Sequence, residues 1–246
     1  MKNLKQIIKE EYQKILQEQN QPKKTFRIRK VHGSFDCSDN ELTSLEGAPR
    51  SVSKKFNCSY SRLTSLKGAP TSLPEDFICT GNKFTSLEGA PRSVGGEFNC
   101  SSNERLTSLE GGPTHVTGIF NCSGTPITSL EGAPTSVSWT FNCSYCDLTS
   151  LKGAPTSVPG YFSCDNNNLT SLEGAPSSVG HSFRCDKNKL TSLEGAPRSV
   201  GEDFYCRDQK SNHFFDEHDV RKVCNVGGKI ETMGHNIDSK RYYKGY

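Results

Sequence analysis

The chain has 246 residues and a mass of 27.1 kDa, and only 32% of its residues are hydrophobic. This hydrophobic content is too low to fill a single large globular core well. No apolar run reaches the ~18 residues typical of a transmembrane helix. Residues 1–30 carry a net charge of +6 and residues 219–246 carry +3, so the total of +3 leaves −6 on residues 31–218. The basic ends indicate solvated caps or contact with an anionic partner.

The first predicted element is an amphipathic helix over residues 3–18, in an N-terminal region of residues 1–24 that ends in a linker with Pro22. Lys and Glu fill one face, and the region lacks the apolar core and cleavage site of a secretory signal. We expect the helix to cap the open end of the repeats that follow. Its apolar face consists of Leu4, Ile7, Ile8, Tyr12, Ile15 and Leu16.

A run of the form Leu-Thr-Ser-Leu-Glu-Gly-Ala-Pro then recurs eight times, each copy within a unit that also carries Phe-x-Cys. A fixed period in this range is typical of one small structural unit stacked many times. Each Phe follows the previous one by 21 residues, except for a step of 22 between Phe98 and Phe120. The Phe positions are 35, 56, 77, 98, 120, 141, 162, 183 and 204.

The alternation in Phe-x-Cys predicts a short strand whose Phe and Cys side chains face inward. Gly and Pro follow the second Leu of each unit and predict a turn. A strand this short cannot bury its inner face alone, whereas parallel stacking at about 4.8 Å buries it continuously. The sequence therefore predicts a β-rich solenoid over residues 25–211, with one parallel sheet of about nine strands.

The pattern Phe77-x-Cys79-x-x-Asn82-x-Phe84-x-x-Leu87 resembles the leucine-rich repeat. The unit length and the Pro after the last Leu look most like the short repeats of bacterial effector proteins. The Leu-Thr-Ser-Leu-Glu-Gly-Ala-Pro run itself looks like repeat proteins encoded by large tailed bacteriophages. The resemblance implies a curved horseshoe with its sheet on the concave face, and a role in binding rather than catalysis.

The Asn position of the leucine-rich repeat tests this resemblance, because that side chain satisfies backbone groups in the turn after the strand. Ser and Thr can do so in part, and Cys is also permitted by the pattern. Along the chain the position holds Asn40, Ser61, Asn82, Asn103, Thr125, Cys146, Asn167, Asn188 and Gln209.

Two departures from the repeat are expected to alter the structure. The fourth unit has an extra residue, Glu104 or Arg105, which predicts a local bulge. In the ninth unit Ser211 and Phe214 replace the Leu pair, so we expect the solenoid to end near residue 206. Residues 212–246 then form a C-terminal cap and tail, with a short helix beginning at Asp216 and continuing through Cys224.

Eleven Cys residues are present, and nine of them belong to the Phe-x-Cys motif. Parallel, in-register side chains rarely meet the torsion that a disulfide requires, so we expect a ladder of buried thiols, with some disulfides or a metal as alternatives. Reduced thiols indicate a reducing compartment, which predicts a cytoplasmic protein, in the host cytoplasm if the chain is viral. His213, His218, Cys224 and His235 match no standard metal spacing, so neither a metal nor a cofactor is expected.

Residues that flank Phe and Cys face outward and form columns along the sheet. Most units carry small polar residues there, so departures toward aromatic residues and Arg mark candidate interface anchors. The alternative interpretation is that these are isolated exposed residues without a role. The candidate binding residues are Ile119, Trp139, Tyr161, Arg184 and Tyr205.

Any Ser or Glu that could serve in catalysis recurs in every unit, as scaffold residues do, so an enzyme is not expected. We predict a non-catalytic protein-binding module, encoded by a phage and binding a host or viral protein through the concave sheet. The alternative is a structural or internal component of a virus particle whose N-terminal helix is a targeting segment, because such helices resemble the N-termini of tailed-phage internal proteins. A third possibility is nucleic-acid contact through the basic termini and the aromatic tail; no membrane partner is expected.

Overall fold

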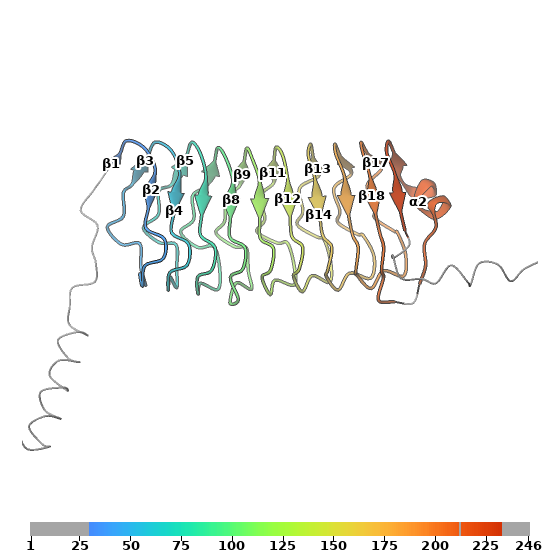
Figure 1. Ribbon diagram of the computed structural model, residues 1–246, viewed down its shortest axis with the longest axis horizontal. Helices are drawn as coiled ribbons and strands as arrows, with labels where there is room; N and C mark the ends of the chain where they lie inside the picture. The colour runs from blue at the N-terminus through green and yellow to red at the C-terminus, as the bar shows by residue number, and fades with distance from the viewer. Residues whose placement is uncertain (1–29, 212, 233–246) are drawn as a thin grey trace, which may run out of the picture.

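The structure, a computed structural model, describes residues 30–211 and 213–232. These residues wind into a parallel β-solenoid whose turns are stacked along one long axis (Figure 1). Each turn, or rung, is about 21 residues long and contributes two strands of two residues each. The helix expected over residues 3–18, its role as a cap or targeting segment, and the boundary at residue 24 lie outside the described residues.

One side of the solenoid is a continuous ten-stranded sheet in which every neighbouring pair is parallel and in register. The Phe residues pair with one another along the sheet, as Phe120 does with Phe98 and Phe141. This row includes the expected nine strands and one more. Its strands are β2 (Phe35–Asp36), β4 (Phe56–Asn57), β6 (Phe77–Ile78), β8 (Phe98–Asn99), β10 (Phe120–Asn121), β12 (Phe141–Asn142), β14 (Phe162–Ser163), β16 (Phe183–Arg184), β18 (Phe204–Tyr205) and β20 (Ile230–Glu231).

A second row of strands runs beside the first, so the expectation of a single sheet was wrong. Its Ser-Val pairs bury Val and expose Ser, but two residues are too few to display an alternating pattern in the sequence. The row consists of three parallel segments. They are β1 (Lys30–Val31) with β3 (Ser51–Val52); β5 (Ser72–Leu73), β7 (Ser93–Val94), β9 (His115–Val116) and β11 (Ser136–Val137); and β13 (Ser157–Val158), β15 (Ser178–Val179), β17 (Ser199–Val200) and β19 (Asn225–Val226).

The core between the rows is built from ladders of identical side chains. Ring centroids of successive Phe residues lie 5.1 to 5.7 Å apart from Phe35 to Phe204, a spacing at which offset aromatic rings attract. From Phe56 onward these rings are fully buried. The Leu pair of each turn and the Val of the second row complete the core, so the predicted inward positions of Phe, Cys and Leu are confirmed.

The glycine of each Leu-Thr-Ser-Leu-Glu-Gly-Ala-Pro run is required by both its backbone conformation and its neighbour. Gly89 has a φ of +91°, in the left-handed region that favours glycine. A Cβ atom there would lie 2.4 Å from the backbone nitrogen of Lys67 in the preceding rung. A side chain at this position would therefore force adjacent rungs apart.

The side chains at the Asn position bond to backbone groups of the turn that follows the strand. Asn167 is buried, and its Nδ2 donates to the carbonyl oxygens of Cys143, Cys164 and Asp165 at 2.9 to 3.2 Å. Its Oδ1 accepts the backbone N–H of Leu148 at 3.0 Å. One amide therefore ties two rungs together and satisfies turn groups that would otherwise be buried without partners.

All eleven Cys residues are free and buried. Most thiols donate to a carbonyl oxygen of the next rung, as Cys143 does to Ser163 at 3.3 Å. The predicted thiol ladder is confirmed in this structure. Cys146 occupies the Asn position and donates instead to the carbonyl oxygens of Cys122 and Ser144.

Beyond residue 211 the strands continue: β19 pairs with β17 and β20 pairs with β18, forming a tenth rung. The expectation that the solenoid ends near residue 206 therefore misplaced its end. The loop of this rung holds α2 (Glu217–Val223), a short helix between Asp216 and Cys224 as the sequence predicted, and Asp216 also forms a capping box with Asp219. In the loop Phe215 is buried, whereas Phe214 is 67% exposed, so Phe215 takes over the core role of the missing Leu.

Within the described ranges, no helix is both long and apolar enough to cross a bilayer. The same part of the chain contains no group of three or more His, Cys, Asp or Glu side chains arranged to hold a metal ion.

Candidate functional site

Four of the five candidate residues lie in the C-terminal half of the solenoid and Ile119 lies near its middle, all on or beside the ten-stranded sheet. Arg184 lies in β16 and Tyr205 in β18, while Ile119 and Tyr161 directly precede β10 and β14. Trp139 precedes β12 by two residues, at the bend between the two strand rows. The structure brings four of these residues together as two separate pairs, Trp139 with Tyr161 and Arg184 with Tyr205. Among the described residues, no ring or ion-pair contact joins Ile119 to either pair.

The first pair belongs to a cluster of three rings, Trp139, Tyr161 and His181, which we call the aromatic corner. The Trp139 and Tyr161 ring centroids lie 6.2 Å apart at an interplanar angle of 82°. His181 lies 4.9 Å from each, stacked on Tyr161 and tilted at 66° against Trp139. Trp139 remains 44% exposed and Tyr161 38%, so the cluster presents rings to solvent while holding each of them in place.

A glycine makes the aromatic corner possible. Trp139, Gly160 and His181 occupy equivalent positions on three successive rungs, linked by backbone hydrogen bonds from Gly160 N to Trp139 O and from His181 N to Gly160 O. Because Gly160 has no side chain, the Trp139 and His181 rings can meet across the rung between them. A Cβ atom on Gly160 would lie 2.3 Å from the carbonyl oxygen of Trp139.

The imidazole of the aromatic corner is held by a carboxylate. Nδ1 of His181 lies 2.7 Å from Oε1 of Glu202, the residue at the equivalent position of the next rung. The second oxygen, Oε2, accepts from the Ser182 hydroxyl at 3.3 Å. A carboxylate on Nδ1 assigns the proton to that nitrogen and fixes the orientation of the ring.

The second pair belongs to an arginine–tyrosine network on β16, β18 and β20. The Arg184 guanidinium carbon lies 4.4 Å from the Tyr205 ring centroid, and that of Arg207 lies 5.1 Å from the same ring. Arg207 is in turn held by Asp186 at 3.1 Å and by Glu231 at 2.9 Å. Its hydrogen bond with Asp186 is the main reason that the pKa of Arg207 is raised.

The hydroxyl of Tyr205 is also committed within this network. It donates to Oδ2 of Asp203 at 2.8 Å, and this bond raises the pKa of Tyr205. The pKa of Asp203 is lowered, first by a hydrogen bond from the backbone N–H of Lys229 and then by the Tyr205 hydroxyl. Tyr205 is therefore a half-buried structural member of the network rather than a free anchor.

The centre of the ten-stranded sheet presents amide donors without acceptors. Near its N-terminal end, Asn57 donates to Asp36 and Asn99 donates to Glu97. On β10 and β12, Asn121 and Asn142 use only their Oδ1 atoms, which accept the N–H groups of Ser123 and Ser144. Within the described residues the side-chain N–H groups of Asn121 and Asn142 have no acceptor, so they are free to bind a ligand.

An open trough of about 440 Å³ lies on the second strand row, and one of its lining residues, Gly180, directly precedes His181 of the aromatic corner. Gly180, Gly201 and Gly227 line this trough, and His181 and Glu202 each follow one of these glycines directly. Its lining also includes the outward-facing Ser157, Ser178, Ser199 and Asn225, with no charged residue among them.

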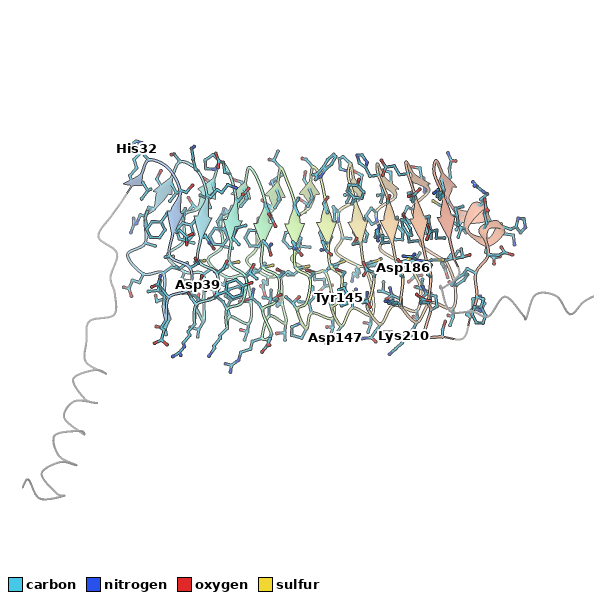
Figure 2. All side chains as sticks on the ribbon, viewed as in Figure 1. His32, Asp39, Tyr145, Asp147, Asp186 and Lys210 are labelled. Carbon is cyan, nitrogen blue, oxygen red and sulfur yellow. The ribbon has the colours of Figure 1, made fainter. Side chains whose placement is uncertain are left out.

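Sequence reasoning missed His181, Glu202, Asp186 and Arg207. The sequence carried only a weak signal for the first two, because the position two residues before Phe holds Gly in four of the nine units and Lys, Glu, Trp or His in the others. Asp186, labelled in the C-terminal half of Figure 2, is buried and bonded to the backbone of Arg207 as well as to its side chain. The contacts that matter join residues 20 to 42 positions apart, which only the stacking of rungs reveals.

The groups on this surface can bind a partner. A histidine oriented by a carboxylate supplies part of a general-base system, but within the described residues no hydroxyl or thiol hydrogen-bonds to the other ring nitrogen of His181. The remaining groups are exposed rings, amide donors and a guanidinium. Such groups recognise a partner surface through desolvated aromatic contact and directed hydrogen bonds.

Comparison of the chain with profiles of known protein families, with curated protein sequences and with solved structures finds no match in any of the three.

Proposed function

We propose that the chain is a non-catalytic protein-binding module of the leucine-rich-repeat type, which binds its partner through the C-terminal half of the ten-stranded sheet. The aromatic corner carries the proposal. Two exposed rings, each buttressed by His181, stand on a rigid solenoid whose other outward positions are mostly small and polar. Aromatic residues that are held in place lose little side-chain entropy on binding and dominate protein interfaces.

The free donors of Asn121 and Asn142 and the guanidinium of Arg184 support the same surface, because they add directed hydrogen bonds beside the rings. The resemblance of the repeat to phage-encoded proteins extends the proposal to a host or viral protein as the partner.

The test is a pair of double variants used against a partner captured from host lysate. Trp139→Ala with Tyr161→Ala should leave the melting temperature nearly unchanged, because both side chains face outward, and should weaken binding by more than 2 kcal/mol, about thirty-fold. Tyr60→Ala with Tyr145→Ala is the matched control. These two tyrosines are 62% and 64% exposed, and Tyr145 lies toward the loop side of the solenoid in Figure 2.

Binding that survives in the first variant would show that the aromatic corner is not the interface. Unfolding of the first variant alone would show instead that the two rings belong to the core.

A further inference from the structure

Glu202, the carboxylate that holds His181, lacks a cationic partner of its own. Its oxygens contact only the imidazole of His181 and the hydroxyl of Ser182, and among the described residues no Lys or Arg forms an ion pair with it. By contrast, the carboxylates Asp186 and Glu231 both form an ion pair with Arg207. Glu202 nevertheless remains about half exposed, so its charge faces solvent beside the aromatic corner.

The rings next to Glu202 also favour a cation. The negative face of Trp or Tyr attracts an ammonium or guanidinium group placed within about 6 Å of the ring centroid. Trp139 and Tyr161 meet nearly at right angles, so one ring offers a face where the other offers an edge. The two rings therefore do not form one flat platform for a planar ligand.

The charge of the solenoid acts in the same direction. Residues 31–218 carry a net charge of −6, and a field of that sign raises the local concentration of cationic groups. The trough beside the corner is lined by Gly, Ser, Pro, Val and Asn and holds no charge. It leaves space for the main chain on which a basic side chain is carried.

We propose that the aromatic corner and Glu202 together bind one basic side chain, Lys or Arg, on an extended segment of the protein partner that lies in the neighbouring trough. This inference rests on the proposed function and adds the chemistry of the partner. It assigns the ring faces of Trp139 and Tyr161 to the alkyl stem and charge of the basic residue, and the carboxylate of Glu202 to its N–H groups.

The chain supplies its own probe for this site, because Trp139 is its only tryptophan. Four blocked five-residue peptides, identical except for a central Lys, Arg, norleucine or Glu, are titrated into the full chain at constant ionic strength. The Lys and Arg peptides should change the tryptophan emission saturably, and the norleucine and Glu peptides should not. A response equal for all four peptides, or no saturable response to Lys and Arg, overturns the proposal.

Charge at Glu202 is tested with the same titration. Glu202→Gln keeps the size of the side chain and its ability to form hydrogen bonds. It should weaken the binding of the Lys and Arg peptides roughly ten-fold. Glu194→Gln, an exposed carboxylate on the loop edge, is the control and should bind as the wild type does. Unchanged affinity in the Glu202 variant overturns the proposal.

The captured partner separates this inference from the proposed function. Loss of partner binding in the Trp139→Ala, Tyr161→Ala variant together with full binding in Glu202→Gln rejects the basic side chain and retains the protein-binding module. Full partner binding in both variants rejects the two together.

Discussion

At the residue scale, the unusual feature of this chain is the number of thiols that are buried away from solvent. Burial raises the pKa of nine of the eleven thiols, to about 12 at Cys37 and about 11 at Cys224. The cause is desolvation, which penalises the thiolate. Cys146 differs, because a hydrogen bond with the Cys122 side chain, aided by Thr125, lowers its pKa to about 7.

These pKa shifts predict a steep loss of stability in alkali. An unfolded thiol ionises near pH 8.5, whereas the folded thiols remain protonated well above that pH. The stabilising effect is therefore complete below about pH 8.5 and is lost as the pH rises toward the folded pKa values. Between its unfolded and folded pKa values each such thiol contributes about 1.4 kcal/mol per pH unit, so nine contribute about 12 kcal/mol per unit, comparable to the whole stability of a domain. Far-UV circular dichroism should show unfolding between about pH 9 and pH 11.

The control for the alkaline transition is Cys224→Ala, which removes one of the nine thiols and should reduce by one the number of protons released on unfolding in this pH range. A thiol reagent at neutral pH should label few groups in the native protein and about eleven after denaturation. A native protein that reacts fully at neutral pH, or that stays folded at pH 11, would contradict the thiol ladder.

At the scale of one rung, the Asn ladder is the main polar device that joins consecutive turns. The amides of Asn82, Asn167 and Asn188 each donate to three carbonyl oxygens and accept one N–H, and Gln209 reproduces the arrangement with a longer side chain. Thr125 makes only one comparable bond, to the carbonyl oxygen of Cys122.

Replacing Asn167 by Ala should therefore cost about 3 kcal/mol of unfolding free energy, because the N–H of Leu148 and several buried carbonyl groups lose their partner. Asn167→Thr should cost less, since a hydroxyl can replace part of the network. Asn168→Ala, at the adjacent half-exposed position, is the control and should change stability by less than about 0.5 kcal/mol. Urea denaturation measures the unfolding free energy of all three variants. Equal losses of stability in Asn167→Ala and Asn168→Ala would contradict a stabilising role for the Asn ladder.

At the scale of the whole molecule, the solenoid is a sum of similar rungs and of the interfaces between neighbours. Rungs pair in register along both strand rows, and each contacts chiefly the rung before and the rung after. Stability in such an array is distributed rather than concentrated in one centre.

This organisation predicts that one complete repeat can be removed. Deleting residues 63–83 joins Arg62 to Phe84, preserves the 21-residue period and leaves the aromatic corner untouched. The shortened protein should fold with a modestly lower melting temperature and retain partner binding. Deleting residues 63–82 instead leaves an extra residue at the junction and should destabilise the protein more, because the inward positions shift out of phase. Equal thermal stability of the two deletion variants would contradict the prediction that the rungs must keep their 21-residue register.

The fold is largely encoded in the repeat, for a physical reason. Phe, Cys, Leu and Asn recur at one period, so these residues take equivalent positions in every rung. The inward ladders, the Asn network and the start of α2 after Asp216 all follow from local patterns of residues. The second strand row was not predicted, because a Ser-Val pair is too short to show the alternation of a strand, and the tenth rung was not predicted, because the repeat ends before it. Ile230 and Glu231 likewise join the sheet without the Phe-x-Cys motif.

The candidate site depended on tertiary structure. Sequence alone identified Trp139, Tyr161, Arg184 and Tyr205 as departures from the small polar residues of most rungs, and also Ile119, which remains isolated. Stacking decided which of them meet. Trp139 contacts His181 across Gly160, 42 positions along the chain, and Tyr205 is committed between two arginines. Contacts between rungs depend on which neighbouring side chains are missing and where each ring points, and these are properties of the packed solenoid rather than of any one repeat.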